Sequence, residues 1–149
     1  RWTEGDLTIG EVLLNPTMIY VDPVINLVLA CRDGSGPCGS EDIKAIAHIT
    51  GGGLSNLLRL HDTLGWHIDE PLPVHPEFSW IAEVGSVDSR EMHRTFNMGM
   101  GMVVAVSEEV ADDVAVWLSN RLRGTRKVGS VTDSGKVTHA DSDVFFDHY

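Results

Sequence analysis

Residues 43–60 of this 149-residue chain read IKAIAHITGGGLSNLLRL, and this stretch decides the fold. Segment 43–50 alternates and is rich in Ile and Ala, which predicts a buried strand. Three glycines follow at 51–53, and the leucines after them recur at three- and four-residue spacing, which is typical of a helix. The pattern therefore predicts a strand that runs through a glycine turn directly into a helix.

The same signals place elements in the rest of the chain, because capping residues, Pro and Gly mark where helices begin and end. Thr8 and Ser107 are expected to cap helices, and the stretches 33–40 and 70–76 are expected to be a loop and a turn. Further helices are predicted at residues 8–14, 23–30, 78–84, 89–96 and 108–122, and further strands at 18–21, 65–68, 100–106, 127–131 and 136–138. Strands alternate with helices, which favours a layered α/β domain.

Length and charge limit the classes of function. The length fits one domain, and the chain lacks the run of about 20 apolar residues that a membrane span needs. Acidic residues number 22 against 11 basic ones, for a net charge of −11. This charge opposes binding to nucleic acid and to anionic lipid, so any anionic ligand has to be held by local geometry.

The glycine turn is the first candidate site. Gly51, Gly52 and Gly53 let the backbone adopt positive φ and approach a ligand closely. Their N–H groups, with those at the start of the following helix, can bind a phosphate. The stretch matches neither a P-loop nor a dinucleotide-binding fingerprint. A flexible turn without a ligand is the alternative.

The second candidate is the stretch 95–102, which reads TFNMGMGM and is preceded by Arg94. The methionines at 98, 100 and 102 alternate, so they share one face of an extended segment, and packing against a neighbouring helix explains them. Asn97 and Gly99 instead indicate a site or a tight turn. Arg94 is close enough in sequence to reach a phosphate or a carboxylate, although a surface ion pair is the commoner role.

Cysteine and histidine patterns indicate no metal site. Cys31 and Cys38 are the two cysteines of the chain; a loop disulfide is geometrically possible, and the reduced form is expected. The spacing of His61, His67 and His75 matches no known metal motif. The histidines are therefore expected to be scattered and to face solvent.

Two stretches together, residues 46–54 (IAHITGGGL) and 92–102 (MHRTFNMGMGM), closely resemble the phosphoribosylformylglycinamidine cyclo-ligase family, also called aminoimidazole ribonucleotide synthetase. The resemblance runs from about residue 8 to 131. It implies the C-terminal domain of a two-domain enzyme, with a layered α+β fold in which helices pack on a mixed sheet. The expected division is a linker and helix at 1–16, the domain at 17–140 and a loose tail at 141–149.

The family resemblance also implies an activity. The family uses ATP and Mg²⁺ to convert formylglycinamidine ribonucleotide to aminoimidazole ribonucleotide in purine biosynthesis. ATP and Mg²⁺ would be bound mostly by the N-terminal domain, which is the expected partner of this chain. A cytoplasmic homodimer is expected, and the fragment alone is expected to be inactive.

Carried onto this sequence, the resemblance assigns roles to individual residues. His48 would orient groups or handle a proton, and Asn97 and Gly99 would line the cleft between the domains. A phosphate, the 5′-phosphate of the substrate or another, would be held by Thr50, Gly51, Gly52 and Gly53. Two alternatives stay open: a binding module without catalysis, and a phosphotransferase relative of the selenophosphate synthetase or thiamine-phosphate kinase type.

The acidic composition yields a first prediction. Asp outnumbers Glu 13 to nine, and only three residues are Lys, a pattern that suggests adaptation to high salt. Because salt screens acidic self-repulsion, stability should be higher in molar KCl than in low KCl. Unfolding curves at the two concentrations measure this. Equal stability would instead indicate an incidentally acidic surface.

Overall fold

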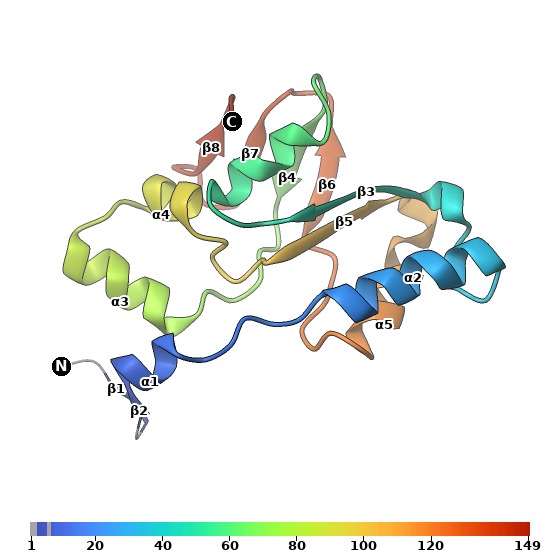
Figure 1. Ribbon diagram of the computed structural model, residues 1–149. Helices are drawn as coiled ribbons and strands as arrows, with labels where there is room; N and C mark the ends of the chain where they lie inside the picture. The colour runs from blue at the N-terminus through green and yellow to red at the C-terminus, as the bar shows by residue number, and fades with distance from the viewer. Residues whose placement is uncertain (1–2, 6) are drawn as a thin grey trace.

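The computed structural model describes residues 3–5 and 7–149, which form three small sheets with helices around them (Figure 1). The strands are β1 (Thr3–Glu4), β2 (Leu7–Thr8), β3 (Ile43–His48), β4 (Gly65–Ile68), β5 (Met102–Val106), β6 (Gly129–Thr132), β7 (Val137–His139) and β8 (Phe145–Phe146). The α-helices are α1 (Ile9–Leu13), α2 (Val21–Asp33), α3 (Pro76–Gly85), α4 (Ser89–Thr95) and α5 (Ala111–Ser119), and the 3₁₀ helices are η1 (Ser40–Asp42), η2 (Gly53–Arg59) and η3 (Glu108–Val110). No helix of the described residues is long and apolar enough to cross a bilayer.

The largest sheet is mixed, with strand order β6-β4-β7-β8. β4 pairs antiparallel with β6 and parallel with β7, and β8 closes the sheet antiparallel to β7. Helices pack around these strands, so the predicted class, a layered α/β fold with a mixed sheet, is confirmed. The predicted strands that form nevertheless divide between two sheets, β3-β5 and β6-β4-β7-β8, and the third sheet, β1-β2, was not predicted.

A two-stranded antiparallel ribbon, β3 with β5, lies beside the mixed sheet (Figure 1). Its register pairs Ala47 with Val103 and His48 with Met102. The pairing shifts between Ile43 and Ala45, which marks a bulge. A bulge adds one residue to a strand and so reverses the face of every side chain beyond it.

The bulge lets the ribbon contribute to two hydrophobic cores. Ala47, Val103 and Ala105 pack into the main core, whereas Ile43 packs into a second core with Val104 and Val106. The buried residues of the main core are Ala47, Ile49, Leu54, Leu57, Trp66, Ile68, Met100, Val137, Val144 and Phe146. The second core is formed by α2, by α5 and by the turn after α5, through Leu27, Cys31, Val114, Leu118 and Leu122. The two cores thus lie on opposite faces of one ribbon.

The N-terminal helix follows its capping signal. The Thr8 hydroxyl accepts the N–H of Glu11, and the Glu11 carboxylate accepts the N–H of Thr8 at 2.8 Å, a complete capping box. α1 then ends at Leu13, directly before Leu14, Asn15 and Pro16, as predicted. The short helix at 8–14 is therefore confirmed.

Two predicted elements near the start of the chain differ. Residues 18–20 form no strand, and Val21 already belongs to α2, so the predicted strand at 18–21 is wrong. The second helix extends on both sides of the predicted 23–30, from Val21 to Asp33. Pro23 lies in its first turn, where a missing N–H leaves no helical hydrogen bond unmade. Gly34, with φ of 80°, ends the helix as a left-handed cap.

Other differences lie where helices and strands begin. The helix after the glycines is a 3₁₀ helix, η2, and the single predicted helix at 108–122 is divided into η3 and α5, which ends at Ser119. Ser107 occupies the N-cap position, but its side chain makes no capping hydrogen bond. The strand predicted to start at Met100 starts at Met102, because a tight turn occupies the residues before it.

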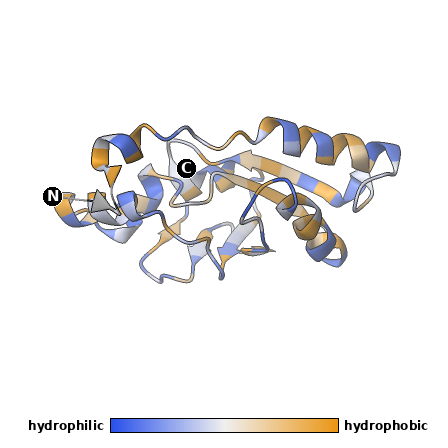
Figure 2. Cartoon of the chain, turned by 90° about the horizontal axis from the view of Figure 1, so that it is seen from below, coloured by the Kyte–Doolittle hydropathy of each residue, from blue (hydrophilic) through white to orange (hydrophobic). Residues whose placement is uncertain are grey.

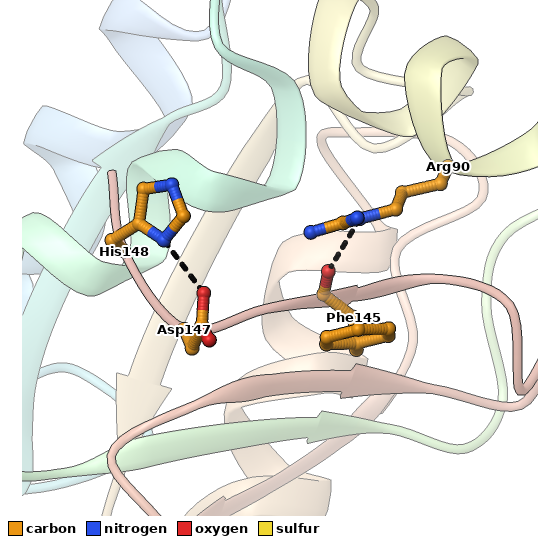
Figure 3. A network of polar contacts seen from close by, with 4 residues as sticks. All are labelled: Arg90, Phe145, Asp147 and His148. Atoms are coloured by element: carbon orange, nitrogen blue, oxygen red, sulfur yellow. Dashed lines mark hydrogen bonds and ion pairs between the residues drawn. The ribbon is translucent and has the colours of Figure 1, made fainter.

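The C-terminal tail, expected to be loose, is instead built into the main core. Val144 and Phe146 are each 1% exposed, and β8 pairs with β7. The Arg90 guanidinium lies over the Phe145 ring at 4.5 Å and donates from Nε to the Phe145 carbonyl oxygen at 3.2 Å (Figure 3). Alternating apolar residues and this contact hold the tail against the sheet.

Adjacent phenylalanines test the packing of the tail. Phe146→Ala removes a buried ring and should lower the free energy of unfolding by about 3–5 kcal/mol. Phe145→Ala removes a ring that is 43% exposed and should cost about 1 kcal/mol or less. Urea unfolding of both variants measures the difference, and equal losses would contradict the burial of Phe146.

Candidate functional site

The glycine turn leaves the end of β3 and is fixed by hydrogen bonds to its own carbonyl groups. The Gly53 N–H donates to the Thr50 carbonyl at 2.9 Å. The Ser55 hydroxyl donates to the Gly52 carbonyl at 2.7 Å, and Asn56 Nδ2 donates to the Gly53 carbonyl at 2.6 Å. Ser55 and Asn56 are buried, so two buried polar side chains hold the turn.

These bonds decide which groups of the turn can meet a ligand. Among the described residues, the N–H groups of Gly51 and Gly52 have no hydrogen-bond partner, whereas that of Gly53 is used within the turn. Gly52 and Gly53 take φ of 98° and 52°, a left-handed backbone that favours glycine. The turn thus offers two backbone donors, and Thr50 and Gly51 are exposed to solvent. Donors of this kind suit the oxygens of a phosphate.

Gly53 also joins the first candidate stretch to the second. A Cβ at Gly53 would overlap the carbonyl oxygen of His93 and lie 2.8 Å from that of Phe96. The Ile49 N–H donates to the Gly101 carbonyl at 2.9 Å. The glycine turn therefore packs on the C-terminal end of α4, and the structure brings together two stretches that are about 40 residues apart.

Residues 97–100 form the tight turn that precedes β5. The Met100 N–H donates to the Asn97 carbonyl at 2.9 Å, and the Gly99 N–H donates to Asn97 Oδ1 at 3.0 Å. Met98 and Gly99 both have positive φ, 47° and 94°. A Cβ at Gly99 would lie 2.6 Å from the Pro73 carbonyl oxygen, so both the turn and this contact require glycine. Asn97 Oδ1 thus serves the turn, and its amide nitrogen remains for other contacts.

His48 lies apart from these contacts. It is exposed at the end of β3, and its ring meets the edge of the Tyr20 ring at 5.8 Å between centroids. Tyr20 also lies against Gly101, where a Cβ would overlap the tyrosine hydroxyl. Burial raises the pKa of Tyr20. The tyrosine, which precedes α2, is thus a neighbour of His48 that the sequence motifs did not single out.

A cavity of about 390 Å³ opens beside the 97–100 turn. Its walls are mostly apolar, with Phe78 and the methionines Met92, Met98 and Met100 among them. The turn interrupts the extended alternation that was expected of the three methionines, and Met98 and Met100 both line the cavity.

Two histidines, His93 and His139, also line this cavity. His93 Nδ1 donates to the Ser89 carbonyl at 2.8 Å, because a carbonyl can only accept. The Asp141 N–H donates to His139 Nδ1 at 3.0 Å, so neutral His139 carries its proton on Nε2, which is buried without a hydrogen-bond partner in the described structure. The two rings lie 4.8 Å apart between centroids.

This histidine pair corrects the expectation of scattered, solvent-facing histidines. His93 is 6% exposed. Burial, and then the neighbouring His93, lower the pKa of His139, which therefore stays neutral to lower pH than a free histidine. Sequence spacing could not reveal the pair, because 45 residues separate its members. Within residues 3–5 and 7–149, no group of three His, Cys, Asp or Glu side chains is arranged to hold a metal ion.

Comparison with known proteins identifies the family. Residues 2–142 match the family described as AIR synthase related protein, C-terminal domain. The chain belongs to this family. The match covers both candidate stretches and confirms the resemblance that they carry.

Named relatives agree with this assignment. The chain is 44% identical over 135 residues to the phosphoribosylformylglycinamidine cyclo-ligase of Methanopyrus kandleri, covering 90% of the chain and 36% of that protein. It is 41% identical over 134 residues to the enzyme of the same name in Methanocaldococcus jannaschii, covering 87% of the chain and 35% of that protein. The chain thus spans about a third of the length of these relatives.

A solved structure supports the fold of this family. The chain superposes on a chain of the HypE–HypF complex with a TM-score of 0.52 and 24% sequence identity, over 77% of this chain and 37% of the other. At this identity the likeness concerns the fold alone.

Two glycines of the turn provide a matched test of its geometry. Gly53→Ala would force a Cβ into the His93 carbonyl at positive φ, and should lower the free energy of unfolding by about 2–5 kcal/mol. A Cβ at Gly51 meets open space, so Gly51→Ala should change it by about 0.5 kcal/mol or less. Urea denaturation compares the two, and a tolerated Gly53→Ala would contradict the packing of the turn on α4.

Proposed function

We propose that this chain is the C-terminal domain of an ATP-dependent cyclo-ligase that converts formylglycinamidine ribonucleotide to aminoimidazole ribonucleotide in purine biosynthesis. The observation that carries the proposal is the glycine turn, fixed on α4, with the free N–H groups of Gly51 and Gly52 at its surface. The two relatives that are named as this enzyme, at 44% and 41% identity, support the choice of reaction.

The residues of this chain would bind and orient the ribonucleotide. The N–H groups of Gly51 and Gly52 and the Thr50 hydroxyl would donate to the oxygens of a phosphate, the 5′-phosphate of the substrate in this proposal. Fixed backbone donors act over a few ångströms and suit an anion even in a chain of net charge −11. Gly53 would shape the turn rather than donate, since its N–H bonds to the Thr50 carbonyl.

Asn97, Gly99 and His48 have supporting roles in this proposal. Gly99 and the Oδ1 atom of Asn97 build the turn that borders the cavity, which leaves the Asn97 amide nitrogen to face the cleft between the domains. His48, exposed at the end of β3 and in contact with Tyr20, would orient groups or handle a proton at that cleft. Both assignments rest on the family resemblance and on these positions.

ATP and Mg²⁺ supply the chemistry that makes the oxygen of the formyl amide a good leaving group. The described residues offer no cluster of three candidate metal ligands. Following the family resemblance, we assign Mg²⁺ and most contacts to ATP to the N-terminal domain.

An exposed apolar surface supports a role for a further domain as partner. On α1, the linker and α2, large apolar side chains are at least half exposed: Leu13 60%, Leu14 83%, Ile19 75%, Val21 60%, Ile25 50% and Leu29 51%. Figure 2 shows apolar residues recurring along α2, the long helix toward the right. Val21, Ile25 and Leu29 recur every four residues and therefore share one face of α2, and an exposed apolar face of this kind is typical of an interface. We propose that the N-terminal domain of the same enzyme covers it, and that the enzyme acts as a homodimer in the cytoplasm.

Substitution of Thr50 in the longer enzyme tests the phosphate assignment. Thr50→Ala keeps the carbonyl that accepts the Gly53 N–H but removes the hydroxyl, so KM for the ribonucleotide should rise about 10- to 100-fold. Thr63→Ala, at another exposed threonine in the loop before β4, is the matched control and should leave KM unchanged. An unchanged KM in Thr50→Ala would remove the hydroxyl from the site.

Amide spectra of residues 1–149 separate the alternatives. Shifts of the Gly51 and Gly52 N–H groups with formylglycinamidine ribonucleotide, and not with its nucleoside, would support a phosphate contact. Shifts with ATP alone would favour the phosphotransferase relatives. Binding of the ribonucleotide without turnover in the longer enzyme would indicate a binding module without catalysis.

A further inference from the structure

The two cysteines of the chain lie side by side, far from the residues assigned to the function above. Cys31 Sγ and Cys38 Sγ are 3.4 Å apart, and both are free thiols. Cys31 lies in the last turn of α2 and is 4% exposed, whereas Cys38, in the loop that follows, is half-buried. A thiol at hydrogen-bond distance from another needs only a small movement of its sulfur to form a covalent bond.

The loop between the cysteines is built to hold this arrangement. The N–H groups of Gly34, Ser35 and Gly36 all converge on the Ala30 carbonyl, with the latter two at 2.9 Å and 2.8 Å. A Cβ at Gly36 would lie 2.6 Å from the backbone nitrogen of Cys31 and 2.8 Å from its sulfur. The Asp33 carboxylate accepts the N–H of Ser35 at 2.9 Å. The chain therefore turns back tightly over Cys31 and returns Cys38 to it.

Both ends of α2 contact the segment that contains β3. At one end, Tyr20, just before α2, packs on His48 at the end of β3. At the other end, Cys31 contacts Cys38, which is followed by η1 and then by the first residue of β3. α2 thus runs antiparallel to β3, and a covalent bond between the sulfurs would join the two at one end.

We propose that Cys31 and Cys38 form a reversible dithiol–disulfide site, which a small neutral disulfide oxidises to an intramolecular bond within a single chain. A neutral oxidant is specified because Glu41 and Asp42 follow Cys38 closely and would repel an anionic one.

The reaction balances in two exchange steps, with hydroxyethyl disulfide as the oxidant. The Cys38 thiolate attacks one sulfur of the reagent, the S–S bond of the reagent breaks, and mercaptoethanol leaves with the proton that Cys38 lost. The Cys31 sulfur, already adjacent, then attacks the Cys38 sulfur of the mixed disulfide. A second mercaptoethanol leaves with the Cys31 proton. Two protein thiols are oxidised, and one reagent disulfide is reduced to two thiols.

Cys38 is the thiol that starts the exchange, because Cys31 is buried. Burial, the contact with Cys31 and the charges of Asp42 and Glu41 raise the pKa of Cys38 to about 12. The thiolate fraction of Cys38, and with it the initial rate, should therefore keep rising about tenfold per pH unit above pH 8.5. The rate of an ordinary cysteine levels off in that range, because its thiol is already mostly ionised.

The test uses the whole chain with hydroxyethyl disulfide at pH 7, 8, 9 and 10. The expected product is a monomer lighter by two hydrogen atoms, restored by excess mercaptoethanol. Its melting temperature should be higher by about 5 °C, because the ring restricts the unfolded chain, and amide exchange over residues 27–33 should be slower. Cys38→Ser, at the half-buried position, should fold and form neither the ring nor a rapid adduct.

Other products would overturn the proposal. A stable adduct with one mercaptoethanol on each cysteine, or a disulfide-linked dimer, would mean that the sulfurs do not meet in solution. Absence of reaction up to pH 10, while the chain in urea reacts, would mean that the folded loop closes Cys38 to exchange. A lower melting temperature after ring closure would mean that the fold opposes the bond.

Discussion

The β3–β5 ribbon is the element on which the rest of this domain depends, because its two faces close two different cores. A two-stranded ribbon is marginally stable in water by itself, so its stability comes from what packs on it. The bulge between Ile43 and Ala45 directs Ile43 to the α2–α5 core and Ala47 to the main core. Without the extra residue, one of these side chains would face the wrong core.

The candidate site follows from the same ribbon. β3 ends at the glycine turn, and β5 begins directly after the 97–100 turn. Because the two strands pair antiparallel, both turns lie at the same end of the ribbon. Close backbone contact then fixes them, since Gly53 leaves no room for a side chain against α4 and Gly99 leaves none against Pro73. The phosphate-binding role proposed for the first turn therefore rests on backbone geometry.

Local signals were readable from the sequence, and long-range ones were not. The Thr8 cap and the strand at Gly65–Ile68 have causes that lie within a few residues, and both were predicted. The second helix was predicted to end near residue 30, and its left-handed cap at Gly34 was not predicted. The sequence located the glycine turn. It could not show that the Gly53 N–H donates to the Thr50 carbonyl, because that bond depends on the backbone conformation of the turn. The pairing of His93 with His139 and the burial of Phe146 depend on contacts across the whole chain, for which periodicity gives no signal.

The order of strands in the mixed sheet has a consequence for how the chain folds during synthesis. Trp66 and Ile68 of β4 find their partners only in β6 and β7, more than 60 residues later. Until that segment leaves the ribosome, β4 has two unpaired edges and two apolar side chains without a core. Such non-local pairing slows folding, so the emerging chain passes through a stage in which this strand is open to association with other chains.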